Sequence, residues 1–138
     1  MFPLTVRHGM PMVERLVPAP PGRAWDLLVD LEAWPRWGPS IRRAELDGAT
    51  ELSLGVHGRV WTAVGVVAPF TVTEFDEGRS WAWQVAGIGA TRHEVRAEPA
   101  GTTVAFGVPW WAPGYLPVCA LALWRIERLL TGRGQPTR

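Results

Sequence analysis

The sequence is poor in cysteine and carries no excess of charge of either sign. Its one cysteine, Cys119, excludes an internal disulfide and gives no zinc or redox signature. The 14 basic residues against 13 acidic residues argue against a nucleic-acid-binding surface and a polybasic membrane anchor. The three histidines have no close spacing, so we predict no metal site, and nothing in the sequence indicates a cofactor.

Long uninterrupted apolar runs are also missing. Residues 1–16 lack the apolar run of a signal peptide, so the cytoplasm is the default expectation for location. The most apolar stretch, residues 110–130, has no charge before Arg125. Because Pro113 and Pro117 interrupt this stretch and it is short, we predict no stable insertion into a membrane.

Tryptophan, by contrast, is abundant. The chain has nine tryptophans, against four phenylalanines and one tyrosine. Its 138 residues are enough to bury a substantial core in one domain. We predict a single domain over residues 1–138, with the core at about residues 12–131 and a flexible tail at residues 132–138.

The end of the chain predicts a long helix over about residues 115–131. Its apolar positions recur at spacings of three and four, which makes one stripe, and Gly132 stands where a helix stop is expected. The first half of this helix is apolar on every side. It must therefore be covered by the rest of the fold or face a cavity, a membrane surface or a partner, which makes a homodimer plausible. The stripe consists of Leu116, Cys119, Leu123, Ile126 and Leu130.

Upstream, the pattern predicts one strand, two short helices and then a series of short strands. Residues 20–22 lead into an amphipathic helix, and a second helical turn ends at Pro35, Gly38 and Pro39. Consecutive short strands with tight turns indicate an antiparallel sheet, whose concave face packs on the final helix in an α+β fold. One of the turns is expected at Pro69. The predicted strands are residues 12–17, 41–46, 59–67, 70–75, 80–85, 90–97 and 103–108.

Several motifs in this arrangement resemble one known superfamily. They are Ala19-Pro20-Pro21 before the first helix, Trp25 within it, Trp34-Pro35-x-Trp37 after it, residues 75–79 followed by Trp83, and residues 97–104. Together they resemble the SRPBCC, START-like or helix-grip proteins, which include polyketide cyclase/dehydrase-type and lipid-transfer members. The resemblance implies a curved antiparallel sheet wrapped around a long C-terminal helix, with two short helices after the first strand. It also implies a ligand cavity between sheet and helix.

Strand alternation identifies His93 as the main polar candidate. In the predicted strands, Trp81 and Trp83 share one face, as do His93 and Val95. If these faces point inward, Arg92, Glu94, Arg96 and Glu98 alternate on the outer face. Neutral imidazole can hydrogen-bond a ligand carbonyl or act as an acid or base near pH 7, although a hydrogen-bonded core histidine is the structural alternative.

Arg59 is the second candidate for chemistry. It lies next to Gly58 and close to His57, where it could line a cavity mouth and bind a carboxylate or phenolate. The structural alternative is a solvated turn.

The tryptophans favour an aromatic ligand. Trp25, Trp34, Trp37 and Trp83 occupy positions that the superfamily often fills with aromatics, so structural packing is expected there. The additional ones include Trp110 and Trp111, which we place at the cavity entrance, with a membrane interface as the alternative. The predicted ligand-binding residues are Trp61, Trp81, Trp83, His93, Phe106, Trp110, Trp111, Cys119 and Leu123.

Three functions are consistent with these residues. The first is binding of a small hydrophobic molecule, aromatic or polycyclic, between sheet and helix. The second is a polyketide cyclase or dehydratase in which His93, with Arg59 or a water, moves protons. The third is a lipid carrier that docks on a membrane surface through Trp110 and Trp111.

Overall fold

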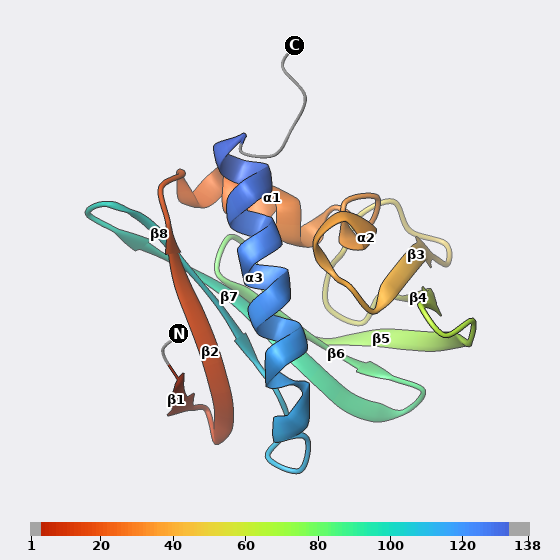
Figure 1. Cartoon of the computed structure of the whole chain (residues 1–138). Helices are drawn as coiled ribbons and strands as arrows, with labels where there is room; N and C mark the ends of the chain where they lie inside the picture. Colours follow the sequence, from red (N-terminus) through yellow and green to blue (C-terminus); the bar gives the residue numbers. More distant parts are fainter. Residues whose placement is uncertain (1–3, 133–138) are drawn as a thin grey trace.

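A curved eight-stranded antiparallel sheet wraps around a long C-terminal helix in the computed structural model, which describes residues 4–132 (Figure 1). The predicted tail, apart from Gly132, lies outside the described residues. The strands are β1 (Leu4–Arg7), β2 (Met10–Val17), β3 (Ile41–Leu46), β4 (His57–Thr62), β5 (Val67–Asp76), β6 (Ser80–Val85), β7 (Ile88–Glu98) and β8 (Gly101–Gly107). The helices are α1 (Pro21–Val29), α2 (Trp34–Trp37), the 3₁₀ turn η1 (Pro113–Tyr115) and α3 (Leu116–Thr131).

The strand order is β1-β2-β8-β7-β6-β5-β4-β3, so the sheet joins the two ends of the chain. From β3 to β8 each strand pairs with its successor. The exception is β2, which pairs with β8 from Met12 opposite Gly107 to Val17 opposite Thr102. The predicted antiparallel sheet and helix-grip architecture are confirmed.

The final helix matches its prediction closely. It begins at Leu116, holds Pro117 in its first turn and ends where Gly132 adopts a left-handed φ of 78°. Its buried side packs against β2, α2 and β8, so the apolar stripe does form the seam between helix and sheet. The buried residues on α3 are Cys119, Ala122, Leu123, Ile126 and Leu130.

Two details of the sheet differ from the prediction. Strand β1 was not predicted; it pairs with β2 at the edge of the sheet. The expected turn at Pro69 is wrong, because the chain turns earlier, where the backbone N–H of Thr62 donates to the Val66 carbonyl at 2.9 Å. Pro69 lies inside β5 opposite Arg59. The backbone of Pro69 faces Ala86, just past the end of β6. The missing N–H of this proline therefore removes no hydrogen bond between strands.

The two tryptophans of the α2 turn fasten α1 to the sheet. The indole N–H of Trp34 donates to the Leu28 carbonyl at 2.8 Å, and that of Trp37 donates to the Leu27 carbonyl at 3.0 Å. The last carbonyls of a helix have no partner within the helix. These indoles supply partners, and the Trp34 ring stacks on Trp81 of β6 with centroids 5.2 Å apart.

Candidate ligand cavity

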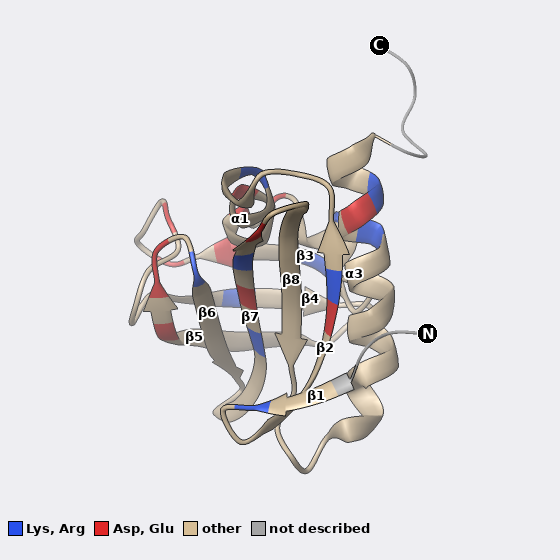
Figure 2. Ribbon diagram, turned by 90° about the vertical axis from the view of Figure 1, so that its left-hand side faces the viewer, with Lys and Arg blue, Asp and Glu red and all other residues tan. Residues whose placement is uncertain are grey.

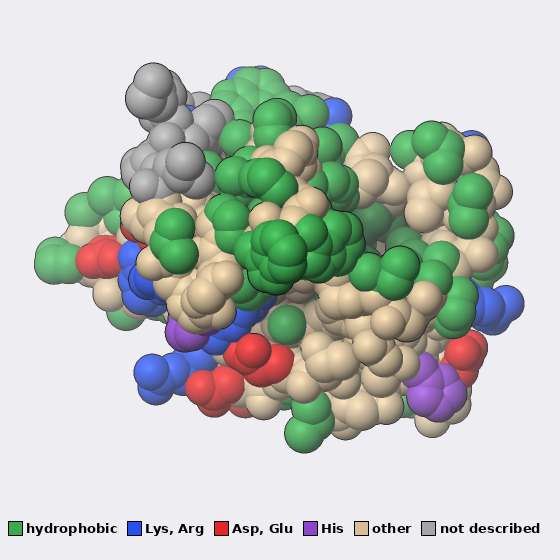
Figure 3. Space-filling view, turned by 90° about the horizontal axis from the view of Figure 1, so that it is seen from below, with side chains coloured by type: hydrophobic (Ala, Val, Ile, Leu, Met, Phe, Trp, Pro, Cys, Tyr) green, Lys and Arg blue, Asp and Glu red, His purple; other side chains and the backbone are tan. Residues whose placement is uncertain are grey.

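A cavity of about 460 Å³ lies against one end of the sheet, beside the loop that joins β8 to α3, and no residue of α3 lines it. This loop is at the bottom of Figure 1 and faces the viewer in Figure 3, where hydrophobic side chains gather at the centre of the surface. A cavity of this size falls within the range typical of small-molecule sites. Its lining comes from the start of β3, the β4–β5 turn, the β6–β7 hairpin and the β8–α3 connection.

The lining of this cavity is apolar and carries no charged side chain. Its polar atoms belong to Ser40, Thr62, Thr91, Tyr115 and the Trp83 indole, and backbone groups complete the wall. The full lining is Ser40, Ile41, Val60, Thr62, Ala63, Val64, Trp83, Val85, Ile88, Gly89, Ala90, Thr91, Val108, Pro109, Trp111, Ala112 and Tyr115.

A pair of hydroxyls forms part of the cavity wall. The Ser40 and Tyr115 hydroxyl oxygens lie 2.6 Å apart and share a hydrogen bond, which ties η1 to the segment before β3. Burial raises the pKa of Tyr115, although the bond to Ser40 opposes that shift. The tyrosine is therefore a neutral hydroxyl at pH 7.

Beyond this pair is a smaller space of about 50 Å³ beneath α3. It shares Ser40, Ile41, Trp83, Thr91 and Tyr115 with the larger cavity. Its other walls include four of the residues predicted to bind a ligand, namely Trp81, His93, Phe106 and Cys119.

His93 is packed into an aromatic cluster and is only 3% exposed. Its ring stacks on Trp81 with centroids 4.0 Å apart and meets Phe106 edge-on at 4.9 Å. Burial lowers its pKa to about 3, although the bond to the Trp81 carbonyl opposes this shift. The imidazole is therefore neutral at pH 7, well away from the range in which it would exchange protons efficiently.

Both ring nitrogens of His93 are already bonded within the protein. Nδ1 lies 3.2 Å from the Trp81 carbonyl, which can only accept, so Nδ1 carries the hydrogen. Nε2 then accepts from the Thr91 hydroxyl at 3.1 Å, and that hydroxyl accepts from the Trp83 indole N–H at 2.9 Å. This chain of bonds leaves His93 no free nitrogen for a ligand.

The remaining predicted residues lie in different surroundings. Trp83 and Trp111 line the large cavity. Trp110 is 76% exposed and lies beside the lining rather than in it, and Leu123 is fully buried in the core. The guanidinium of Arg59 lies over the Trp61 ring, 5.3 Å from its centroid.

Alternation along β4 explains why Arg59 and Trp61 are away from the cavity. Val60 and Thr62 line it, so Arg59 and Trp61 project from the opposite face. There Arg59 pairs with Glu45 at 3.1 Å and with Asp47 at 3.6 Å.

The sequence analysis did not identify most of the lining residues. Ser40, Val60, Thr91, Val108 and Tyr115 were not singled out as ligand-binding residues. One signal was available, since all of these except Ser40 fall in stretches without charge. The uncharged stretches are residues 60–73, 80–91 and 99–124.

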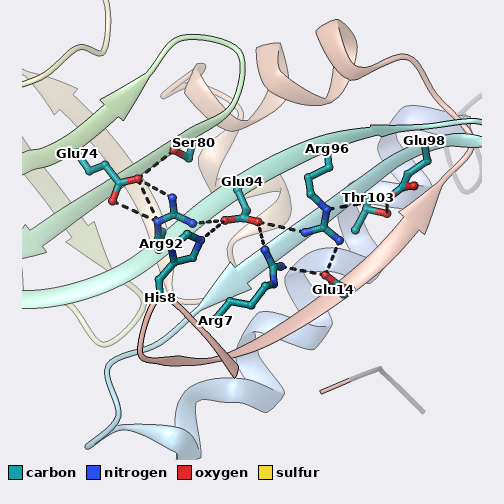
Figure 4. Close-up of polar contacts among 10 residues, drawn as sticks. All are labelled: Arg7, His8, Glu14, Glu74, Ser80, Arg92, Glu94, Arg96, Glu98 and Thr103. Atoms are coloured by element: carbon teal, nitrogen blue, oxygen red, sulfur yellow. Dashed lines mark hydrogen bonds and ion pairs between the residues drawn. The ribbon is translucent and has the colours of Figure 1, made fainter. Parts of the chain in front are cut away.

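The outer face of the sheet is the opposite of the cavity in character. Charged residues alternate along β7 (Figure 2), as the strand pattern predicts. The Glu94 carboxylate is at their centre (Figure 4), bonded to Arg7 at 2.6 Å, to Arg96 at 3.2 Å and to Arg92. Burial alone would raise the pKa of Glu94, but the guanidinium groups of Arg7 and Arg92 outweigh it and the pKa is lowered.

A second groove, of about 640 Å³, lies between α1, β3 and the β3–β4 loop. Its lining includes six carboxylates and a Trp25 indole that already donates to Glu77 at 3.1 Å. Among residues 4–132, no three His, Cys, Asp or Glu side chains are grouped so that they could hold a metal ion. The six acidic residues are Asp26, Asp30, Glu32, Glu45, Glu51 and Glu77.

None of the helices within residues 4–132 combines the length and apolarity needed to cross a bilayer. The apolar surface is instead gathered around the β8–α3 loop. Trp110, Trp111, Leu121 and Trp124 are all exposed there or on the adjoining part of α3.

A curved antiparallel sheet around a long C-terminal helix defines a helix-grip protein. Residues 12–121 match the sequence model of the family described as "Polyketide cyclase / dehydrase and lipid transport". This match covers most of the chain, so the protein belongs to that family, of the SRPBCC type that the motifs indicated.

Solved structures agree on the fold. Protein MLL2253 from Mesorhizobium loti is 15% identical with a TM-score of 0.70, and the match covers 91% of this chain and 98% of that one. Protein NE0264 from Nitrosomonas europaea is 18% identical with a TM-score of 0.66, covering 88% and 93%. The Aha1 dimer from Colwellia psychrerythraea is 18% identical with a TM-score of 0.67, covering 89% and 96%. No curated protein matches the chain's sequence.

Proposed function

We propose that this protein binds a small hydrophobic molecule in the 460 Å³ cavity. The observation that carries the proposal is the cavity's lining, which is apolar, uncharged and formed by four separate parts of the fold. Each Å² of apolar surface buried on binding contributes about 25 cal/mol before ordering costs. The aromatic rings of Trp83 and Trp111 suit a planar ligand.

The polar groups favour binding over catalysis. An acid or base must reach the reacting atoms with a pKa suited to the working pH. His93 has both nitrogens bonded and a pKa of about 3, while Arg59 lies on the other face of β4. Among the lining side chains only Tyr115 titrates, with its pKa raised, so a cyclase or dehydratase is the less supported function.

A direct test is titration of the purified protein with Nile red, a neutral fluorescent dye, alongside native mass spectrometry for bound small molecules. Val85 lines the cavity, whereas Gln84 beside it does not. We expect Val85→Phe to fill the cavity and reduce dye binding, and Gln84→Phe to leave it unchanged. Equal binding by both variants would place the dye elsewhere and contradict the proposal.

A second candidate is lipid exchange at a membrane surface. It is favoured by the exposed Trp110 and Trp111 beside the cavity, since tryptophan partitions well to membrane interfaces. We expect such a carrier to sediment with phosphatidylcholine vesicles, and the Trp110→Ser, Trp111→Ser double variant to stay in solution. Absence of sedimentation by the unaltered protein would remove this candidate.

A further inference from the structure

The lining of the cavity contains no charged side chain to meet an ionised ligand. The three uncharged stretches, residues 60–73, 80–91 and 99–124, supply nearly the whole lining, and Ser40 and Ile41 complete it. The chain has no lysine, so no long ammonium side chain is available anywhere in the described structure.

None of the arginines next to the lining in sequence contributes to it: Arg42, which follows Ile41, is exposed to solvent, and the others are engaged on other surfaces. Arg59 and Arg43 lie over the Trp61 ring on the face of β4 that points away from the cavity. Arg92 bonds Glu74 at 2.7 Å and also pairs with Glu94 on the outer face of the sheet. A carboxylate entering the cavity would therefore lose water without gaining a positive partner.

The cavity's side-chain hydrogen-bonding capacity is also limited. The Thr91 hydroxyl already donates to His93 and accepts from Trp83, so it has no hydrogen left to donate to a ligand. The Ser40–Tyr115 pair differs, because its internal bond uses only one of its two hydrogens. The other hydrogen and the oxygen lone pairs are available to a ligand oxygen.

Building on the proposed binding function, we infer that the cavity selects uncharged molecules with one hydrogen-bonding oxygen and rejects their ionised counterparts. The apolar body of the ligand lies between the hairpins and Trp111, and its oxygen meets the Ser40–Tyr115 pair. Neutral ketones and alcohols are thus ligands, whereas carboxylates of the same shape are excluded, since an unpaired charge loses hydration without compensation.

A matched pair of ligands tests the rule. 2-Acetylnaphthalene and 2-naphthoate have nearly the same shape and differ in charge at pH 7.5, and each can be followed by displacement of Nile red. We expect the ketone to bind and the carboxylate to bind about 30-fold more weakly. 2-Ethylnaphthalene, which has no oxygen, reports the apolar contribution alone.

Two variants test the cause. Val64 lines the mouth and is 84% exposed, so Val64→Arg adds a cation there with little risk to folding. It should strengthen 2-naphthoate binding about fivefold relative to binding of the ketone. Val66→Arg, in the same turn but outside the lining, is the control.

Tyr115→Phe tests the oxygen contact. It removes one hydroxyl of the pair and should weaken binding of the ketone about fivefold, while 2-ethylnaphthalene binds as before. A similar loss for both ligands would refute the contact, because it would mean that the change had altered the cavity as a whole.

The outcomes separate the inference from the proposed function. If Nile red does not bind and no neutral ligand binds, the proposed function fails and the inference fails with it. If ketone and carboxylate bind equally well, the cavity is a binding site but the rule on charge is wrong. Tight ketone binding, weak carboxylate binding and partial recovery in Val64→Arg together support the rule.

Discussion

The two ends of the space inside the curved sheet have similar apolar composition but opposite packing. At the α1–α2 end, large rings fill it: Trp34 stacks on Trp81, Trp81 stacks on His93, and Phe106 closes the cluster. At the β8–α3 end, smaller side chains such as Val60, Val85 and Val108 leave a cavity. Apolar character alone therefore does not distinguish a core from a site. What distinguishes them is whether the side chains are large enough to fill the space.

The largest effect on stability should come from removing a ring of the aromatic cluster at the filled end. Trp34 is fully buried, stacked on Trp81 and bonded to the Leu28 carbonyl. Trp34→Ala should lower the free energy of unfolding by about 3–5 kcal/mol, because it creates a cavity and leaves a helix carbonyl without a partner. Chemical denaturation measures this. A loss similar to that of a surface substitution would show that the cluster does not hold the core together.

The next largest effect on stability is expected from the hydrogen bonds of Thr91, which join the two ends. Thr91→Val removes the hydroxyl that accepts from Trp83 and donates to His93. Two buried polar groups then lose a partner, and the free energy of unfolding should fall by about 1–3 kcal/mol. Thr91→Ser keeps the hydroxyl and is the control. If the Thr91→Val and Thr91→Ser variants were equally stable, the hydrogen bonds of Thr91 with Trp83 and His93 would contribute nothing to stability.

The buried histidine makes stability depend on pH. The His93 pKa is about 3 in the folded protein against 6.5 for the ordinary side chain, so between these values the unfolded chain holds the proton more strongly. The free energy of unfolding should therefore fall as pH is lowered below 6.5, with this residue contributing up to about 1.4 kcal/mol per pH unit.

This slope can be isolated by denaturation at pH 6.5 and pH 5, above the range in which the lowered pKa values of Glu74 and Glu94 matter. Those two carboxylates contribute stability that is lost only as pH falls below their ordinary value of 4.5. His93→Gln should flatten the slope. An unchanged slope in His93→Gln would mean that the imidazole is not held neutral.

The smallest effect on stability is expected at the open end. Trp111 is 55% exposed, so Trp111→Ala should change the free energy of unfolding by no more than about 0.5 kcal/mol. The same change removes part of the cavity wall and should weaken Nile red binding. A large loss of stability without loss of dye binding would mean that Trp111 belongs to the stabilising core and not to the binding site.

The sequence was sufficient to predict which side chains face inward at the filled end, although it assigned Trp81, His93 and Phe106 to a ligand site. The period of α3, the α2 turn with its two tryptophans and the alternation of β6, β7 and β8 each determine which side chains face inward. Trp81, His93 and Phe106 accordingly lie where the alternation puts them. Strand β1 was missed because its four residues have little pattern of their own.

The open end was harder to predict, for a physical reason. A cavity exists where side chains fail to meet, and this depends on distances between elements far apart in sequence. Arg59 and Trp61 show the difficulty. The turn after their strand was predicted at Pro69, but it lies before Val67, so β4 is shorter than predicted. Val60 is buried, whereas its neighbours Arg59 and Trp61 are more exposed. Alternation along the strand therefore puts Val60 on the inner face and Arg59 and Trp61 on the outer face.

The pairing of β2 with β8 has a consequence for how the protein is made. Met12 and Gly107 are neighbours in the sheet but are separated by most of the chain. During synthesis β2 must wait for β8 to leave the ribosome, and α3, which covers both, emerges later still. Until then the apolar faces of both strands lack their cover. The last quarter of the polypeptide therefore decides whether the first quarter folds or aggregates, and a truncated product lacking α3 should be handled by the cell as a misfolded chain.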